Sequence, residues 1–270
     1  MRAPLPFTAA LVTVAALCAG CASHDDAGDG SAAKSTAAKT APADAVRAAV
    51  KATRATSAHT RQNVKISDGQ GQTYRIDITG GFDLDADRGA LSVRMPGGPT
   101  GRIDEVFADD TVYVRGTGDL AMDGWGSTSR SAAKAHAMLR APLNDPEYVL
   151  EQISAMRQVT ESGTETLDKT PATHYRGTLG HSTLTLRTTS KIRDKAEEAR
   201  DYLGSDLPVF ADAWIDGKGR IVRARTDLNL GGVRMTVTLS LSQHGKPVRV
   251  AVPDAGQTSP VPGFDGPMLG

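Results

Sequence analysis

The chain of 270 residues contains only two thiols, Cys18 and Cys21, and both lie in the segment LCAGC at 17–21. A thiolate can act as a nucleophile, bind a metal or form a disulfide. The residues before these cysteines help to decide which role applies. Residues 7–20 form an uncharged, Ala/Val/Leu-rich run that follows the single charge of Arg2. That run is shorter than the roughly 20 apolar residues of a membrane-spanning helix. A short basic start, an apolar run and small residues before Cys21 are typical of a secretory signal.

The same five residues resemble the lipobox of bacterial lipoproteins, in which an aliphatic residue and two small residues precede a cysteine. Here the third position before Cys21 holds Cys18, and Leu17 lies one place further back. In that family the cysteine thiol receives a diacylglyceryl group and the peptide is cut before it. The resemblance implies a signal peptide over 1–20, lipidation of Cys21, and anchoring to the extracytoplasmic face of the cell membrane. An ordinary cleaved signal and an uncleaved anchor are the alternatives.

Histidines and carboxylates elsewhere lack the spacing of a catalytic or metal site. No HExxH or HxH pattern occurs among the histidines, which are His24, His59, His136, His174, His181 and His244. His174 and His181 fall on neighbouring expected strands, but surface or turn histidines are the favoured interpretation. The paired acids fall in a tether, a turn and a helix surface, and the glycine-rich segments do not join a strand to a helix as a phosphate loop does. We therefore predict no catalytic residue, no metal, no cofactor and no enzyme.

Charge and composition divide the chain into anchor, tether and domain. The 31 basic and 31 acidic residues balance, so no net charge draws the chain to nucleic acid. Residues 22–42 have little to bury and are expected to be a flexible tether. If Cys21 is acylated, the mature chain has no free thiol, and the domain over 43–254 depends on an ordinary core. The Pro/Gly-rich residues 255–270 are expected to be an irregular tail.

The elements that would position a binding site alternate between helical and strand periodicity. Helices are expected over 43–57, 129–140, 145–159 and 191–204, the first with Val46, Ala49, Val50 and Thr53 on one face. Strands are expected over 61–67, 72–80, 81–95, 101–116, 163–180 and 182–188, with a turn at 109–110 and a loop over 118–127. Asp145 is a good helix N-cap and Gly204 a good helix end. The chain is therefore expected to be α+β and mostly antiparallel.

Residues 207–253 give the clearest strand signal, with turns at DGKG, LGGV and QHGK. A two-residue hairpin at 231–232 would place Leu230 opposite Val233 and Leu228 opposite Met235. An apolar face of these strands is the candidate wall of a ligand cavity, and its residues are Trp214, Leu228, Leu230, Met235, Val237, Leu239 and Leu241. An ordinary core between sheet and helices is the favoured interpretation of the same residues, and a cavity wall is the alternative.

Three stretches resemble actinobacterial lipoproteins of the LppX/LprG type, which share the LolA-like fold. They are the lipobox with its polar tether, the hairpin VFADDTVYVRG, and the hairpin ADAWIDGKGRIVRARTDL. The resemblance implies a curved antiparallel half-barrel sheet with helices packed on its concave face. It also implies a membrane-anchored exported lipoprotein that binds or carries a lipid, glycolipid or other hydrophobic ligand. The alternative is a non-enzymatic interaction or sensor lipoprotein with a filled core and no ligand.

Overall fold

The computed structural model describes residues 40–98, 100–118, 121, 123–130, 144–186, 190–207, 209–230 and 232–260. These residues belong to a compact unit that starts at Thr40. The predicted signal peptide, Cys21, nearly all of the tether and most of the expected helix over 129–140 lie outside the described residues. Within the described residues, no helix is long and apolar enough to span a membrane.

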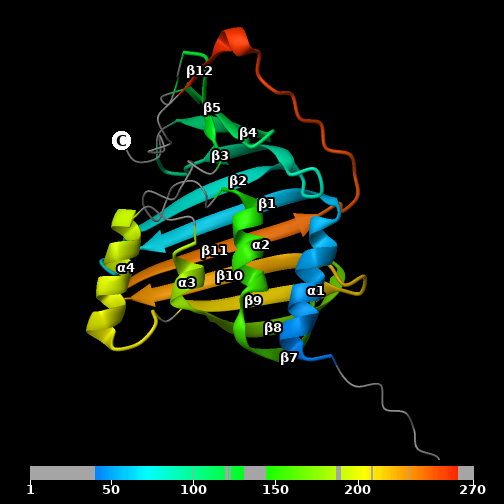
Figure 1. Cartoon of the computed structure of the whole chain (residues 1–270), viewed down its shortest axis with the longest axis vertical. Helices are drawn as coiled ribbons and strands as arrows, with labels where there is room; N and C mark the ends of the chain where they lie inside the picture. Colours follow the sequence, from blue (N-terminus) through cyan, green and yellow to red (C-terminus); the bar gives the residue numbers. More distant parts are fainter. Residues whose placement is uncertain are drawn as a thin grey trace, which may run out of the picture. The chain divides into compact units, whose positions relative to one another are not determined.

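One sheet of 12 strands forms the framework of this unit (Figure 1). Its strand order is β12-β6-β5-β4-β3-β2-β1-β11-β10-β9-β8-β7, so the sheet is open and ends at β12 and β7. The strands are β1 (Ser57–Ser67), β2 (Thr73–Asp83), β3 (Arg88–Arg94), β4 (Gly101–Ala108), β5 (Thr111–Gly118), β6 (Trp125–Ser129), β7 (Arg157–Leu167), β8 (Thr170–Leu179), β9 (Val209–Asp216), β10 (Ile221–Leu230), β11 (Val233–Ser242) and β12 (Thr258–Pro260). Neighbouring strands are antiparallel except β12 and β6, which are parallel.

Four α-helices lie on one face of this sheet in the described part of the chain (Figure 1). They are α1 (Pro42–Arg54), α2 (Pro146–Ser154), α3 (His181–Leu184) and α4 (Ser190–Leu203), and a short 3-10 helix, η1 (Ala255–Gln257), precedes β12. We call the sheet face that these helices cover the helix-side face and the opposite one the outer face. The predicted fold class, a curved antiparallel half-barrel with helices on its concave face, is confirmed.

Helix α1 has the buried face that its sequence period predicts. The buried positions follow the spacing i, i+3, i+4 and i+7 and are Val46, Ala49, Val50 and Thr53. Pro42 lies in the first turn, where a backbone N–H would form no hydrogen bond within the helix, so its lack of an N–H costs nothing. The Thr53 hydroxyl oxygen accepts a hydrogen bond of 2.8 Å from the backbone N–H of Ile221 at the start of β10. This bond fixes the helix to the middle of the sheet.

Helix α2 is fixed at its N-terminus by Asp145, as its sequence predicts. The carboxylate accepts from the backbone N–H of Glu147 (2.9 Å), which is one of the otherwise unpaired amides of the first turn. The same carboxylate accepts two hydrogen bonds of 2.8 Å from Arg130. The Arg130 guanidinium also lies over the rings of Phe82 and Phe107, 5.5 and 5.4 Å from their centroids. Arg130 therefore connects the N-cap of α2 to the aromatic core residues of the sheet.

Several elements differ from the sequence-based prediction. The expected strand over 182–188 is wrong: 181–184 form helix α3, in which the backbone N–H groups of Thr183 and Leu184 donate to the carbonyl of Gly180. The expected loop over 118–127 contains the start of β6, and the expected tail contributes η1 and β12. No strand forms over 246–254, although the alternation there resembles one. In each case the outcome depends on whether a neighbouring strand is available for pairing, which alternation alone does not show.

Candidate hydrophobic-ligand site

The apolar side chains of β11 form part of the core on the helix-side face. Val237, Leu239 and Leu241 are buried, and Leu239 is completely so. The residues between them, Thr236, Thr238 and Ser240, point to the outer face because successive side chains of a strand alternate. The predicted alternation is confirmed. These three apolar residues pack in the core, and their role as a cavity wall stays a prediction.

The same face is only partly covered at its β10–β11 hairpin end. Leu228 lies opposite Met235, and Leu230 pairs with Val233 through its backbone, which is the predicted hairpin register. Leu228, Val233 and Met235 are partly buried against the core. The side chain of Leu230 lies outside the described part of the chain. The end of the apolar face therefore retains accessible hydrophobic surface.

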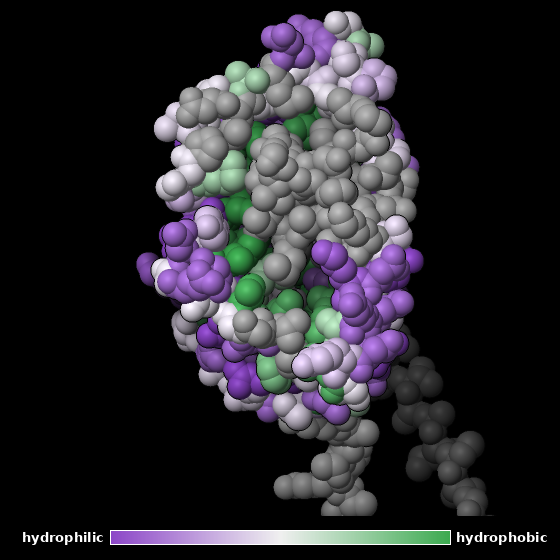
Figure 2. Space-filling view, turned by 90° about the vertical axis from the view of Figure 1, so that its left-hand side faces the viewer, coloured by the Kyte–Doolittle hydropathy of each residue, from purple (hydrophilic) through white to green (hydrophobic). Residues whose placement is uncertain are grey.

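Helices α3 and α4 contribute small and apolar side chains to this region. Leu184 of α3 and Ala196 and Ala199 of α4 are partly buried against the same core. None of the described side chains of α4 is buried, which is unusual for a helix that lies on a sheet. Figure 2, viewed from the side at which α4 lies in Figure 1, shows hydrophobic surface in a hollow between polar rims. Among its described side chains, α4 thus packs against the core through the small residues Ala196 and Ala199.

Trp214 does not belong to this face, which corrects the predicted cavity wall. On β9 the neighbours Ala213 and Ile215 point into the core, so Trp214 points to the outer face. Its ring stacks on His174 with centroids 4.4 Å apart, and its indole N–H donates to Glu165 over 3.1 Å. The tryptophan is buried by polar neighbours rather than by the helices.

The histidine beside Trp214 is engaged on both ring nitrogens. His174 Nε2 lies 2.8 Å from Asp212 Oδ1, and Nδ1 lies 2.9 Å from Glu165 Oε1. Arg176 also donates to Asp212, over 3.0 Å. With both nitrogens occupied, this imidazole has none free to bind a metal or to take a proton from a substrate. His181 begins α3, so the pair of neighbouring strand histidines does not form.

No described group of three or more His, Cys, Asp or Glu side chains has an arrangement that could hold a metal ion. A buried acid does lie on the helix-side face, and sequence reasoning missed it. Burial raises the pKa of Glu105 to about 7, while the hydrogen bond from Asn144 opposes this shift and the charge of Asp145 adds to it. Its only signal in the sequence was a carboxylate at an inward position between Ile103 and Phe107.

Comparisons with known proteins place the fold. No protein-family model matches the chain, and no curated protein matches it. Among solved structures, the lipoprotein LppX of Mycobacterium tuberculosis is 18% identical with a TM-score of 0.50, over 77% of this chain and 97% of LppX. LprF of Mycobacterium bovis is 15% identical with a TM-score of 0.48, over 79% and 97%. A LolA-superfamily protein of Nitrosomonas europaea is 10% identical with a TM-score of 0.28, over 81% and 98%. The likeness to LppX shows that this chain has the LppX-type fold.

Proposed function

We propose that the protein is an exported lipoprotein that binds a lipid or another hydrophobic ligand between the sheet and its helices. The observation that carries this proposal is the incomplete cover of the apolar face at Leu228, Val233 and Met235. Exposed apolar surface that is rimmed by polar residues is typical of ligand grooves and interaction sites. The arrangement supports binding rather than catalysis, because the buried histidine is fully engaged by carboxylates.

The proposed anchor is a lipid on Cys21, after removal of residues 1–20, with 21–42 as a tether. This would place the domain over 43–254 at the extracytoplasmic face of the cell membrane. Stable anchoring takes more than one acyl chain, which a diacylglyceryl group supplies. A tether of this length would let the domain reach the membrane surface and turn freely beside it.

Mass spectrometry of lipid extracted from the full chain, purified from membranes in mild detergent, tests the binding proposal. We expect a lipid species near one per protein, and Met235→Trp should reduce it because the larger side chain fills the open end of the apolar face. Phe210→Trp is the matched control, since Phe210 is exposed on the outer face of β9. Absence of lipid from the unmodified chain, or equal lipid in both variants, would contradict the proposal.

A protein-interaction module without a ligand is the second candidate, and one observation favours it. Tyr202 and Leu203 at the end of α4 are 91% and 42% exposed. Exposed large apolar side chains on one helical turn are typical of contact surfaces. If the purified chain carries no lipid and Tyr202→Ser abolishes capture of a membrane partner, the interaction module is the better description.

A further inference from the structure

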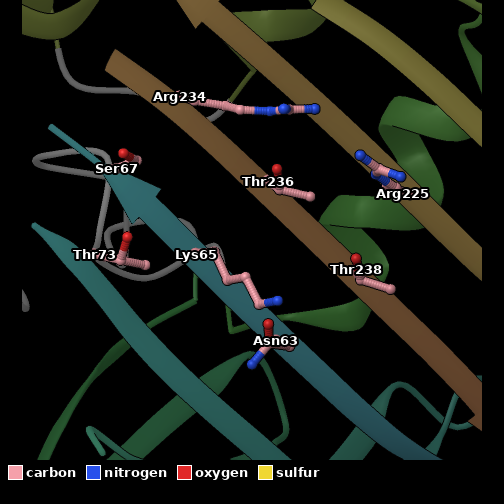
Figure 3. Close-up of a pocket in the computed structure, with 8 residues that line it drawn as sticks. All are labelled: Asn63, Lys65, Ser67, Thr73, Arg225, Arg234, Thr236 and Thr238. Atoms are coloured by element: carbon pink, nitrogen blue, oxygen red, sulfur yellow. The ribbon is translucent and has the colours of Figure 1, made fainter. Parts of the chain in front are cut away.

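The outer face carries a polar hollow that the proposed lipid site does not use. It has a volume of about 440 Å³ and is lined by Lys65, Thr73, Arg225, Arg234, Thr236 and Thr238, which we call the outer hollow (Figure 3). The pairing register explains its form. Thr236 lies opposite Lys65 on β1, and Thr238 lies opposite Arg225 on β10. Short hydroxyl side chains on β11 therefore form a floor between longer cationic side chains.

Positive charge dominates this hollow. Asp227 accepts hydrogen bonds from Arg225 (2.9 Å), Arg234 (2.9 Å) and the Thr236 hydroxyl (2.9 Å). Burial would raise the pKa of Asp227, but these hydrogen bonds and the charge of Arg234 outweigh it and lower the pKa, so the carboxylate is ionised at neutral pH. The hollow thus contains three cations, Lys65, Arg225 and Arg234, and the single carboxylate of Asp227 beside them leaves an excess of positive charge.

Two cations on this face, Lys65 of the hollow and Arg75 beside it, have no partner among the described residues. Lys65 and Arg75 lie directly opposite each other on β1 and β2, and neither makes an ion pair or hydrogen bond within the described part. Like charges at directly opposite positions of a sheet repel and reduce stability. The Nε atom of Arg225 is also buried without a partner in that part. These features favour the binding of an anion on this face.

We propose that the outer hollow binds a phosphate-bearing ligand, either the headgroup of an anionic lipid or a soluble phosphate ester. Arginine and lysine side chains supply charge-assisted donors to phosphate oxygens, and threonine hydroxyls supply neutral ones. The hollow opens on the face opposite to the helices, so it can be occupied independently of a hydrophobic ligand. This inference does not depend on the proposed function.

Two binding measurements on the full chain carrying Cys21→Ser identify the source of the phosphate. Titration calorimetry uses inorganic phosphate and glycerol 3-phosphate, and vesicle co-sedimentation uses phosphatidylcholine with and without phosphatidylglycerol. Binding of the soluble probes without selective vesicle binding assigns a soluble ester. Selective binding to phosphatidylglycerol vesicles assigns a lipid headgroup. Added salt should weaken either interaction, because much of the attraction is between partly exposed charges.

The variant Lys65→Gln removes the unpaired cation that lines the hollow and leaves the Asp227 hydrogen bonds intact. It should weaken binding by about tenfold, which corresponds to the loss of one charge-assisted contact. It should melt at or above the temperature of the chain with Lys65, because the like-charge repulsion with Arg75 is relieved. Lys51→Gln on α1 is the control, since it removes the same charge from an exposed site in the helix layer. Failure of the Cys21→Ser chain to bind any probe, or equal binding by its Lys65→Gln and Lys51→Gln variants, overturns the proposal.

Discussion

Replacing Glu105 by glutamine tests the electrostatics around Asn144 and Asp145, which precede helix α2. Glu105 is only 6% exposed, and its Oε1 accepts a hydrogen bond of 2.7 Å from the Asn144 side chain. Its Oε2 is buried without a partner in the described part of the chain. Burial accordingly raises its pKa from 4.5 to about 7. A carboxyl group with this environment is stabilised in its protonated form.

The sign and the size of the effect follow from proton linkage. The folded chain binds the Glu105 proton more tightly than the unfolded chain, so the contribution to stability is fully present below pH 4.5 and is lost as the pH rises through about 7. A shift of this size corresponds to about 3 kcal/mol between the two limits. Glutamine is neutral at every pH, has nearly the same shape and can still accept from Asn144. Glu105→Gln should therefore match the unmodified chain at about pH 4 and exceed its free energy of unfolding by up to about 3 kcal/mol at pH 8.

Urea unfolding of both chains between pH 4 and pH 8 measures this difference directly. Glu197→Gln is the control, because Glu197 is an exposed carboxylate on α4 and the same substitution there should leave the pH profile unchanged. Parallel profiles for Glu105→Gln and the unmodified chain would refute the argument, since they would mean that Glu105 titrates alike in the folded and unfolded states.

Three further predictions concern the core, the α2 cap and the anchor. Leu239→Ala should lower the free energy of unfolding, measured in urea, by about 2–5 kcal/mol, because it leaves a cavity in a completely buried site. Met235 is only partly buried, so an equal loss for Met235→Ala would contradict this. Arg130→Met should lower the free energy of unfolding by about 3–5 kcal/mol, since it removes the cation that pairs with the buried Asp145. An unchanged free energy of unfolding would exclude a stabilising role for this ion pair. Cys21→Ser should release the protein from membranes or leave its signal peptide uncleaved, as cell fractionation and mass spectrometry of the N-terminus would show. A variant that is cleaved and still membrane-bound would exclude lipidation of Cys21.

Local pattern predicted the elements whose partners are close in sequence. The turn at Asp109 and Asp110 was readable because short acidic side chains tolerate the positive φ of 50° and 58° that both residues adopt. The β10–β11 register followed from the two residues between the strands and from the apolar positions on either side. Helix α4 ended at Gly204, whose φ of 65° suits a left-handed position. Each of these features is decided within a few residues.

Features that depend on distant partners could not be predicted in this way. The alternation around Thr183 and Leu184 favoured a strand, but they form a helix after Gly180, where no described strand pairs with them. Trp214 was assigned to the apolar face, whereas its neighbours on the outer face are His174 and Glu165 from other strands. The outer hollow combines β1 with β10 and β11, and the β1–β11 pairing joins positions too far apart in sequence for alternation to reveal.

Strand β11 carries both proposed binding surfaces, and its alternation keeps them apart. Val237 and Leu239 point to the helix-side face, while Thr236 and Thr238 point to the outer face. A shift of one residue in the pairing would exchange the two sets and bury hydroxyls in the core, so the register on which both surfaces depend is held by core packing. Substitutions that keep the polarity of an outer position should therefore change anion binding and leave the apolar face intact. The two sites share one strand, yet each can be altered through its own set of alternate residues.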